Sequence, residues 1–139
     1  MKHFIWFIIL LWSSVVSAEN LSIHPNDHDY KDLRLEFNKC KSVMYVALGK
    51  RLDEIVKTSP DSGKDFYRKL DKRFFNGERA LTKLEMSVMS LAEIDELKKL
   101  DWPYSFEVGM ARGFNSTAPV SSVIESIAYC ERLLENIGL

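Results

Sequence analysis

The stretch DYKDLRLEFNKCKSVMYVALGKRLDEIVK, residues 29–57, combines helical spacing of apolar side chains with a cysteine near the middle of that pattern. The apolar positions recur every three or four residues: Leu33, Phe37, Cys40, Met44, Leu48, Leu52 and Ile55. At about 100° per residue they fall on one face of a helix. The sequence therefore predicts one long amphipathic helix that ends before Pro60, since proline disfavours helix in the residue preceding it.

Arg51 is an exception, because it projects close to the apolar face of this helix. It lies near the predicted helix end, so its long side chain could run along the apolar surface and reach water. A buried ion pair, for instance with Glu107, is the alternative interpretation.

The last predicted helix, residues 122–137, carries the second cysteine at the equivalent place. Its inward face contains Val123, Ile127, Cys130, Leu134 and Ile137. Ser122 and Glu125 fit a capping box at its start, and Gly138 is placed to end it. Because the chain has two cysteines, each on an inward face, we predict a Cys40–Cys130 disulfide. Two buried free thiols are the alternative.

Three helical segments are expected between these two. Residues 62–76 should form a helix that ends at Gly77, and residues 78–100 a helix that breaks at Ser90, where Ser90 and Glu93 fit a capping box. In residues 101–117, Phe106, Met110 and Phe114 line one side, while Gly109 and Gly113 indicate close packing against the first helix. The fold class is therefore all-α, a small bundle of four to five helices with the first and last helices crosslinked by a disulfide.

Residues 1–18 have a basic start at Lys2, an apolar run and small residues up to Ala18, which is the pattern of a secretory signal peptide. An uncleaved membrane anchor is the alternative, but the run is short for a membrane span. Cleavage would leave residues 19–139 as a single helical domain, with residues 19–28 as a flexible lead-in, no later membrane span and a periplasmic or secreted location.

The formal charge is −1 for the whole chain and −2 after loss of Lys2 with the signal peptide. This near balance gives no general attraction to nucleic acid or to an anionic membrane. The charges are nevertheless segregated, because residues 64–83 are mainly basic and residues 85–107 mainly acidic. Either both segments are solvated helix faces, or the basic one contacts an acidic partner through Arg68, Lys69, Lys72 and Arg73.

Trp102, Tyr104 and Phe106 form a second candidate partner-binding surface. Rigid aromatic side chains often anchor protein interfaces. The alternative is that this segment simply packs tightly against the first helix.

Motifs for chemistry are absent from the sequence. There is no HExxH, GxSxG, CxxC or glycine-rich phosphate loop. His24, Asp27 and His28 do not share a helix face, so we expect no metal site there, and Glu93 with Glu96 is better explained as a solvated helix face than as a cation site. Catalytic residues and cofactors are not expected. Asn20 and Asn115 fit the glycosylation pattern, which matters in a eukaryotic host.

The sequence thus favours an exported small helical binding protein, of the inhibitor or immunity type, that acts by contact with a protein partner. The alternatives are a carrier of a small ligand or cofactor in a pocket between helices, and an extracellular four-helix signalling protein. An enzyme ranks below these. The host, the oligomeric state and the partner stay open at this stage.

Overall fold

The computed structural model describes residues 30–59, 63–101 and 104–138, and all secondary structure in them is helical. The helices are α2 (Tyr30–Gly49), α3 (Leu52–Thr58), α4 (Lys64–Val88), α5 (Leu91–Lys98), α6 (Phe106–Thr117) and α7 (Val120–Asn136). The all-α class is confirmed. The expected four to five helices become six in the described residues.

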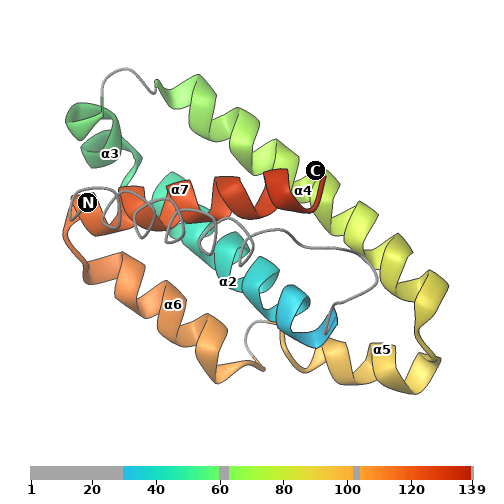
Figure 1. Cartoon of the computed structure of the whole chain (residues 1–139). Coiled ribbons are helices and arrows are strands. Elements are labelled where there is room, and N and C mark those ends of the chain that lie inside the picture. Colours follow the sequence, from blue (N-terminus) through green and yellow to red (C-terminus); the bar gives the residue numbers. More distant parts are fainter. Residues whose placement is uncertain (1–29, 60–62, 102–103, 139) are drawn as a thin grey trace, which may run out of the picture.

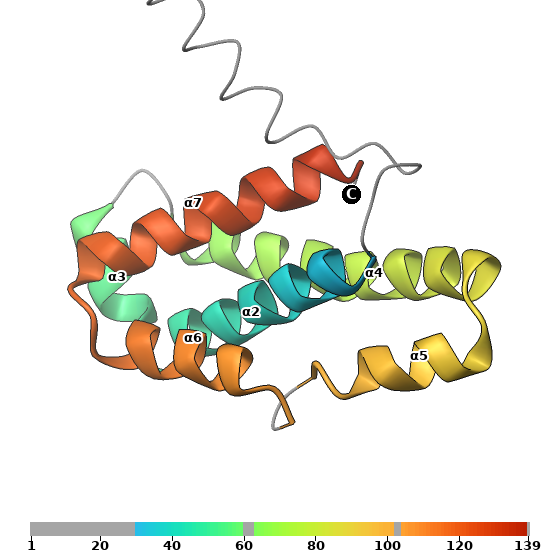
Figure 2. The same ribbon diagram turned by 60° about the horizontal axis from the view of Figure 1, so that its bottom comes forward.

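The centre of the fold is α2, which lies between α4 and α6 and is crossed by α7 (Figure 1). Its buried residues lie on all sides of the helix: Leu33, Arg34, Phe37, Asn38, Cys40, Ser42, Val43, Met44, Val46 and Ala47. A helix buried all round must be enclosed by several neighbours, and α2 packs against α3, α4, α6 and α7. Figure 2 shows this arrangement from a second direction.

The core joins residues that are far apart in the chain. The rings of Phe37 and Phe74 meet with centroids 5.5 Å apart, and Ile55, Val123 and Leu134 are completely buried. Burying such a side chain contributes about 1.5–3 kcal/mol relative to leaving it exposed. The core therefore fixes α3, α4 and α7 around α2.

The prediction of one helix over residues 29–57 is wrong, because the helix breaks at Lys50 and Arg51. Gly49, which has low helix propensity, is the last residue of α2. Arg51 is the N-cap residue of α3, and its guanidinium donates hydrogen bonds to the carbonyl oxygens of Asn115 and Ala118. Contacts to a distant segment thus compensate for the interrupted helix.

The prediction that a helix ends at Gly77 is also wrong, since α4 continues to Val88. The buried residues of α4 keep helical spacing through this position: Tyr67, Leu70, Phe74, Gly77, Leu81 and Glu85. A glycine inside a helix costs about 1 kcal/mol relative to alanine. Packing of the buried face on both sides of Gly77 offsets that cost.

The predicted break at Ser90 is confirmed. Ser90 is the N-cap residue of α5, its side chain accepts a hydrogen bond from the Glu93 amide, and the Glu93 carboxylate accepts one from the Ser90 amide. This reciprocal capping box satisfies two amides that would otherwise lack helical partners, so it starts a new helix after the turn.

The start of α7 differs from the prediction. The helix begins at Val120, with Pro119 as the N-cap residue, and the Pro119 carbonyl accepts hydrogen bonds from the amides of Ser122 and Val123. Ser122 already lies inside the helix, so the predicted Ser122–Glu125 capping box is wrong. The end is as expected, since Gly138 has a φ of +74°, a conformation that glycine adopts without steric cost.

No helix in the described residues is long and apolar enough to cross a membrane. The expected signal peptide (residues 1–18) and lead-in (residues 19–28) lie outside those residues.

Candidate binding groove

Cys40 of α2 and Cys130 of α7 form a disulfide, with their Cα atoms 5.4 Å apart. The predicted crosslink is confirmed, and the alternative of two free thiols is excluded. Both cysteines are buried, because each lies on the face of its helix that packs against the other. The bond fixes the register of α7 against α2 and is compatible with an exported protein.

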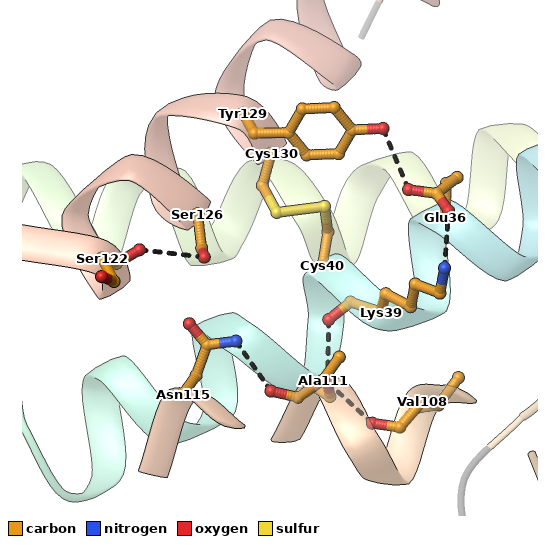
Figure 3. Close-up of a disulfide and its surroundings, with 11 residues drawn as sticks. Glu36, Lys39, Cys40, Val108, Ala111, Asn115, Ser122, Ser126, Tyr129 and Cys130 are labelled. Carbon is orange, nitrogen blue, oxygen red and sulfur yellow. Dashed lines mark hydrogen bonds and ion pairs between the residues drawn. A yellow bond between two sulfur atoms is a disulfide. The ribbon is translucent and has the colours of Figure 1, made fainter. Parts of the chain in front are cut away.

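An open groove of about 750 Å³ lies directly over this disulfide, between α6 and α7. Both helices pack on α2, whose Val43 joins Cys40 and Cys130 in lining the groove. Met110 and Phe114 line it from α6, and Tyr129 lines it from α7. Figure 3 shows α6 and α7 on opposite sides of the disulfide.

The α6 face that contributes to this groove corrects one expectation. Phe106, Met110 and Phe114 do line one side of the helix, but that side is exposed, with 79%, 58% and 58% of each residue accessible. The residues that α6 buries are Val108 and Asn115. Tight packing of α6 on α2 is confirmed, but Gly113 is exposed, and a Cβ atom there would meet nothing within 4 Å.

Charged side chains connect α2, α6 and α7 across one end of the groove. Lys39 Nζ lies 2.8 Å from Glu36 and 3.4 Å from Glu107, and Tyr129 Oη donates a hydrogen bond of 2.9 Å to Glu36 (Figure 3). The hydrogen bond to Glu36 raises the pKa of Lys39. Burial, together with the same carboxylate, raises the pKa of Tyr129, so the phenol stays neutral at physiological pH.

Asn115 lines the groove and is only 2% exposed. Its Nδ2 donates to the carbonyl oxygen of Ala111 at 2.7 Å, and its Oδ1 points toward α7 with no hydrogen-bond partner (Figure 3). The folded chain therefore covers the amide that a glycan would occupy at this position. Asn20, the other predicted acceptor, lies outside the described residues.

The predicted basic surface lies on α4. Arg68, Lys69 and Lys72 are exposed, while Arg73 is half-buried and lies 3.8 Å from Glu131 of α7. In the predicted aromatic surface, Tyr104 and Phe106 are each 79% exposed, and Trp102 lies outside the described residues. The two surfaces lie on opposite sides of α2 and are not brought together (Figure 1). Their role in binding stays a prediction.

Arg51 matches neither interpretation of the sequence. Its side chain is 12% exposed and lies 3.0 Å from Glu54, in addition to its hydrogen bonds to the end of α6. The suggested ion pair with Glu107 is wrong, because Glu107 pairs with Lys39.

In the described residues, no three or more His, Cys, Asp or Glu side chains gather to hold a metal ion. Glu93 is engaged in its capping box, and Glu96 pairs with Lys99, so the structure gives each a structural partner. His24, Asp27 and His28 lie outside the described residues.

A buried ion-pair cluster between α2 and α4 was not predicted. Arg34 Nε and Nη2 each donate to the Glu85 carboxylate at 2.8 Å, and Nη1 donates to Glu78 at 2.7 Å. Burial opposes the charge on Arg34, but these carboxylates outweigh it and the pKa of Arg34 is raised. Arg34 and Glu85 each stand beside apolar residues in the sequence. Nothing in their spacing indicates that the two side chains meet.

Glu78 should make the stability of the protein sensitive to acid. Burial raises the pKa of Glu78, but a hydrogen bond from Lys41 and the charge of Arg34 outweigh it, so the net pKa is lowered. A carboxylate with a lowered folded pKa stabilises the fold above its unfolded pKa of about 4.3 and loses that contribution as pH falls through the folded value. Glu78→Gln should therefore lower the free energy of unfolding by about 1–2 kcal/mol at pH 7.

This difference between wild type and Glu78→Gln should shrink as the pH is lowered through the folded pKa of Glu78. Urea unfolding at several pH values from 7 to 3 measures it. A difference that is constant over this range would show that Glu78 acts through packing rather than charge. Asp95→Asn, at an exposed carboxylate paired with Lys98, is the matched control and should change little.

Comparison with known protein families, with curated proteins and with solved structures finds no match to this chain.

Proposed function

We propose that this chain is an exported, non-enzymatic helical protein that acts by binding another protein, in the manner of an inhibitor or immunity protein of the periplasm or cell exterior. The observation that carries the proposal is the exposed apolar row on α6, formed by Phe106, Met110 and Phe114. A contiguous exposed apolar patch marks sites of protein contact. Tyr104 lies just before this row and is as exposed as Phe106.

The rigidity of the body supports the same function. The disulfide ties α7 to α2, and the Arg34 cluster ties α4 to α2. A surface held in one conformation loses little entropy on binding, which favours affinity.

A small-ligand carrier is the second candidate, and the groove favours it. A volume of about 750 Å³ lies within the range of roughly 300–1,000 Å³ that is usual for ligand pockets. Met110 and Phe114 are nevertheless largely exposed, so a small ligand in this groove would stay in contact with water on one side.

Native mass spectrometry separates the two functions. The protein is expressed for export in its own host, purified under non-denaturing conditions and measured intact. We expect a complex with a second protein at a fixed stoichiometry. A mass increase of a few hundred daltons, released on denaturation, would instead support the carrier.

Charge reversal tests the predicted basic surface independently. If that surface contacts the partner, Arg68→Glu combined with Lys72→Glu should weaken the complex and leave the melting temperature nearly unchanged, because both side chains are exposed. Unchanged affinity would remove the basic face of α4 from the interface and leave the α6 surface.

A further inference from the structure

The groove between α6 and α7 resembles a position in a helix bundle from which one helix is missing. α6 and α7 lie on opposite sides of the disulfide (Figure 3), and the open groove lies between them. Cys40 and Val43 line it from α2 beneath, and Cys130 lines it from α7. An elongated apolar ligand that lies along the base of the groove would contact α6 and α7 at the same time.

The apolar wall of the groove continues beyond it. Met110 and Phe114 lie within the groove, and Phe106 extends the same face of α6 by one further turn. Eight residues separate Phe106 from Phe114, which corresponds to about 12 Å along the helix axis. This length matches about two turns of a second helix, which would present apolar residues at spacings of three and four.

The charge around the groove is negative. Glu36, Glu107 and Glu125 line it, together with one basic residue, Lys39. Glu107 and Glu125 are exposed and stand on opposite walls, on α6 and α7. If a bound ligand has positive side chains on both sides of an apolar face, one side therefore lies near Glu107 and the other near Glu125.

A second observation points to an occupant. Asn115 is buried in the groove wall, and its Oδ1 lacks a hydrogen-bond donor. A buried acceptor without a partner costs about 1–3 kcal/mol. Oδ1 points from α6 toward α7 (Figure 3), which places an unpaired acceptor in the wall of the groove.

We propose that this groove binds a basic amphipathic helix of a partner protein. Its apolar face packs on Val43, Met110 and Phe114, and its lysine or arginine side chains pair with Glu107 and Glu125. This inference rests on the proposed function and adds to it the place and the chemistry of the partner.

The probe is a fluorescein-labelled amphipathic peptide of about 16 residues built from Leu, Ala and Lys, a length that gives about four helical turns. The matched peptide has Glu in place of Lys. Fluorescence anisotropy measures binding of each to the purified, disulfide-bonded protein. We expect saturable binding of the basic peptide and none of the acidic peptide at the same concentration.

Charge variants locate the binding site. Glu107→Lys combined with Glu125→Lys should weaken binding of the basic peptide by about tenfold or more. The control, Asp95→Lys combined with Glu135→Lys, makes the same change in net charge at exposed positions outside the groove. An equal loss in both double variants would reduce the binding to general charge attraction and overturn the proposal.

Apolar variants test the wall in the same way. Met110→Ser combined with Phe114→Ser should also weaken binding by about tenfold, while Met86→Ser combined with Val88→Ser, at exposed apolar positions of α4, should not. Circular dichroism melts establish that each variant is folded.

Several results would overturn the proposal. They are failure of the basic peptide to bind, equal binding of the acidic peptide, or a wild-type dimer that Phe114→Ser converts to monomer, which would assign the groove to a second copy of the chain. A natural partner held equally well by wild type and by the groove variants would overturn this inference and leave the proposed function intact.

Discussion

Replacing Cys40 and Cys130 together by alanine should lower the free energy of unfolding by about 4–5 kcal/mol. The two cysteines are 90 residues apart in sequence, so the bond removes a large part of the conformational entropy of the unfolded chain. A domain of this size has about 5–15 kcal/mol of stability in total. The loss would therefore leave the fold marginal.

Urea unfolding of the wild type with and without reductant gives the same comparison without mutation. The reduced wild type and the double alanine variant should unfold at similar urea concentrations, and both should unfold well below the oxidised protein. A shift in stability of less than about 1 kcal/mol would contradict the entropic account. Intact mass after alkylation of denatured, unreduced protein provides the control, since the disulfide leaves no thiol to react.

Replacing Arg34 by leucine should lower the free energy of unfolding by about 3–5 kcal/mol, because it leaves the Glu85 carboxylate buried without a partner. The Arg34 and Glu85 side chains are only 7% and 5% exposed. The loss of Arg34 should cost less at Glu78, because the Glu78 side chain is 32% exposed and also pairs with Lys41 at 2.8 Å.

The double variant Arg34→Leu with Glu85→Leu is the matched control. Removing both members of a buried ion pair in favour of apolar side chains is often neutral or stabilising, so the double variant should be more stable than Arg34→Leu alone. If the two variants prove equally unstable in urea, the loss comes from packing of the arginine stem and not from the unpaired charge.

The disulfide and the break at Ser90 could be predicted because both depend on short-range patterns. Cys40 and Cys130 each stand on a regular apolar face, and Ser90 and Glu93 form a capping box within one helical turn. Local rules of this kind are not sufficient by themselves, since the predicted helix end at Gly77 and the Ser122–Glu125 capping box follow similar rules and are wrong.

The central place of α2 could not be predicted, because its second buried face is partly polar. Asn38 and Ser42 lie outside the apolar face that the sequence pattern identifies. In the structure, Asn38 donates to the carbonyl oxygen of Leu100 and Ser42 to those of Lys39 and Val108. Hydrogen bonds to the backbone, including those to Leu100 and Val108 in distant segments, help these polar side chains to be buried.

The groove could not be predicted, because the sequence pattern does not show which face of α6 is exposed. Phe106, Met110 and Phe114 form the more apolar face, yet α6 turns Val108 and Asn115 toward its neighbours. Ser42, on the facing side of α2, is small and also contacts α6 through Val108, so α2 and α6 can approach closely there. This is a departure from the rule that the most apolar face is buried, and such departures are concentrated at functional sites.

The most direct test of protein binding through the groove is capture of the natural partner from exported proteins of the host. Tagged wild type, the Glu107→Lys/Glu125→Lys variant and the Asp95→Lys/Glu135→Lys control are used in parallel, with quantitative mass spectrometry of the captured proteins. The account predicts one protein that is enriched by wild type and control and reduced about tenfold with the groove variant. Equal capture by all three forms, or no enriched protein with any of them, would contradict it.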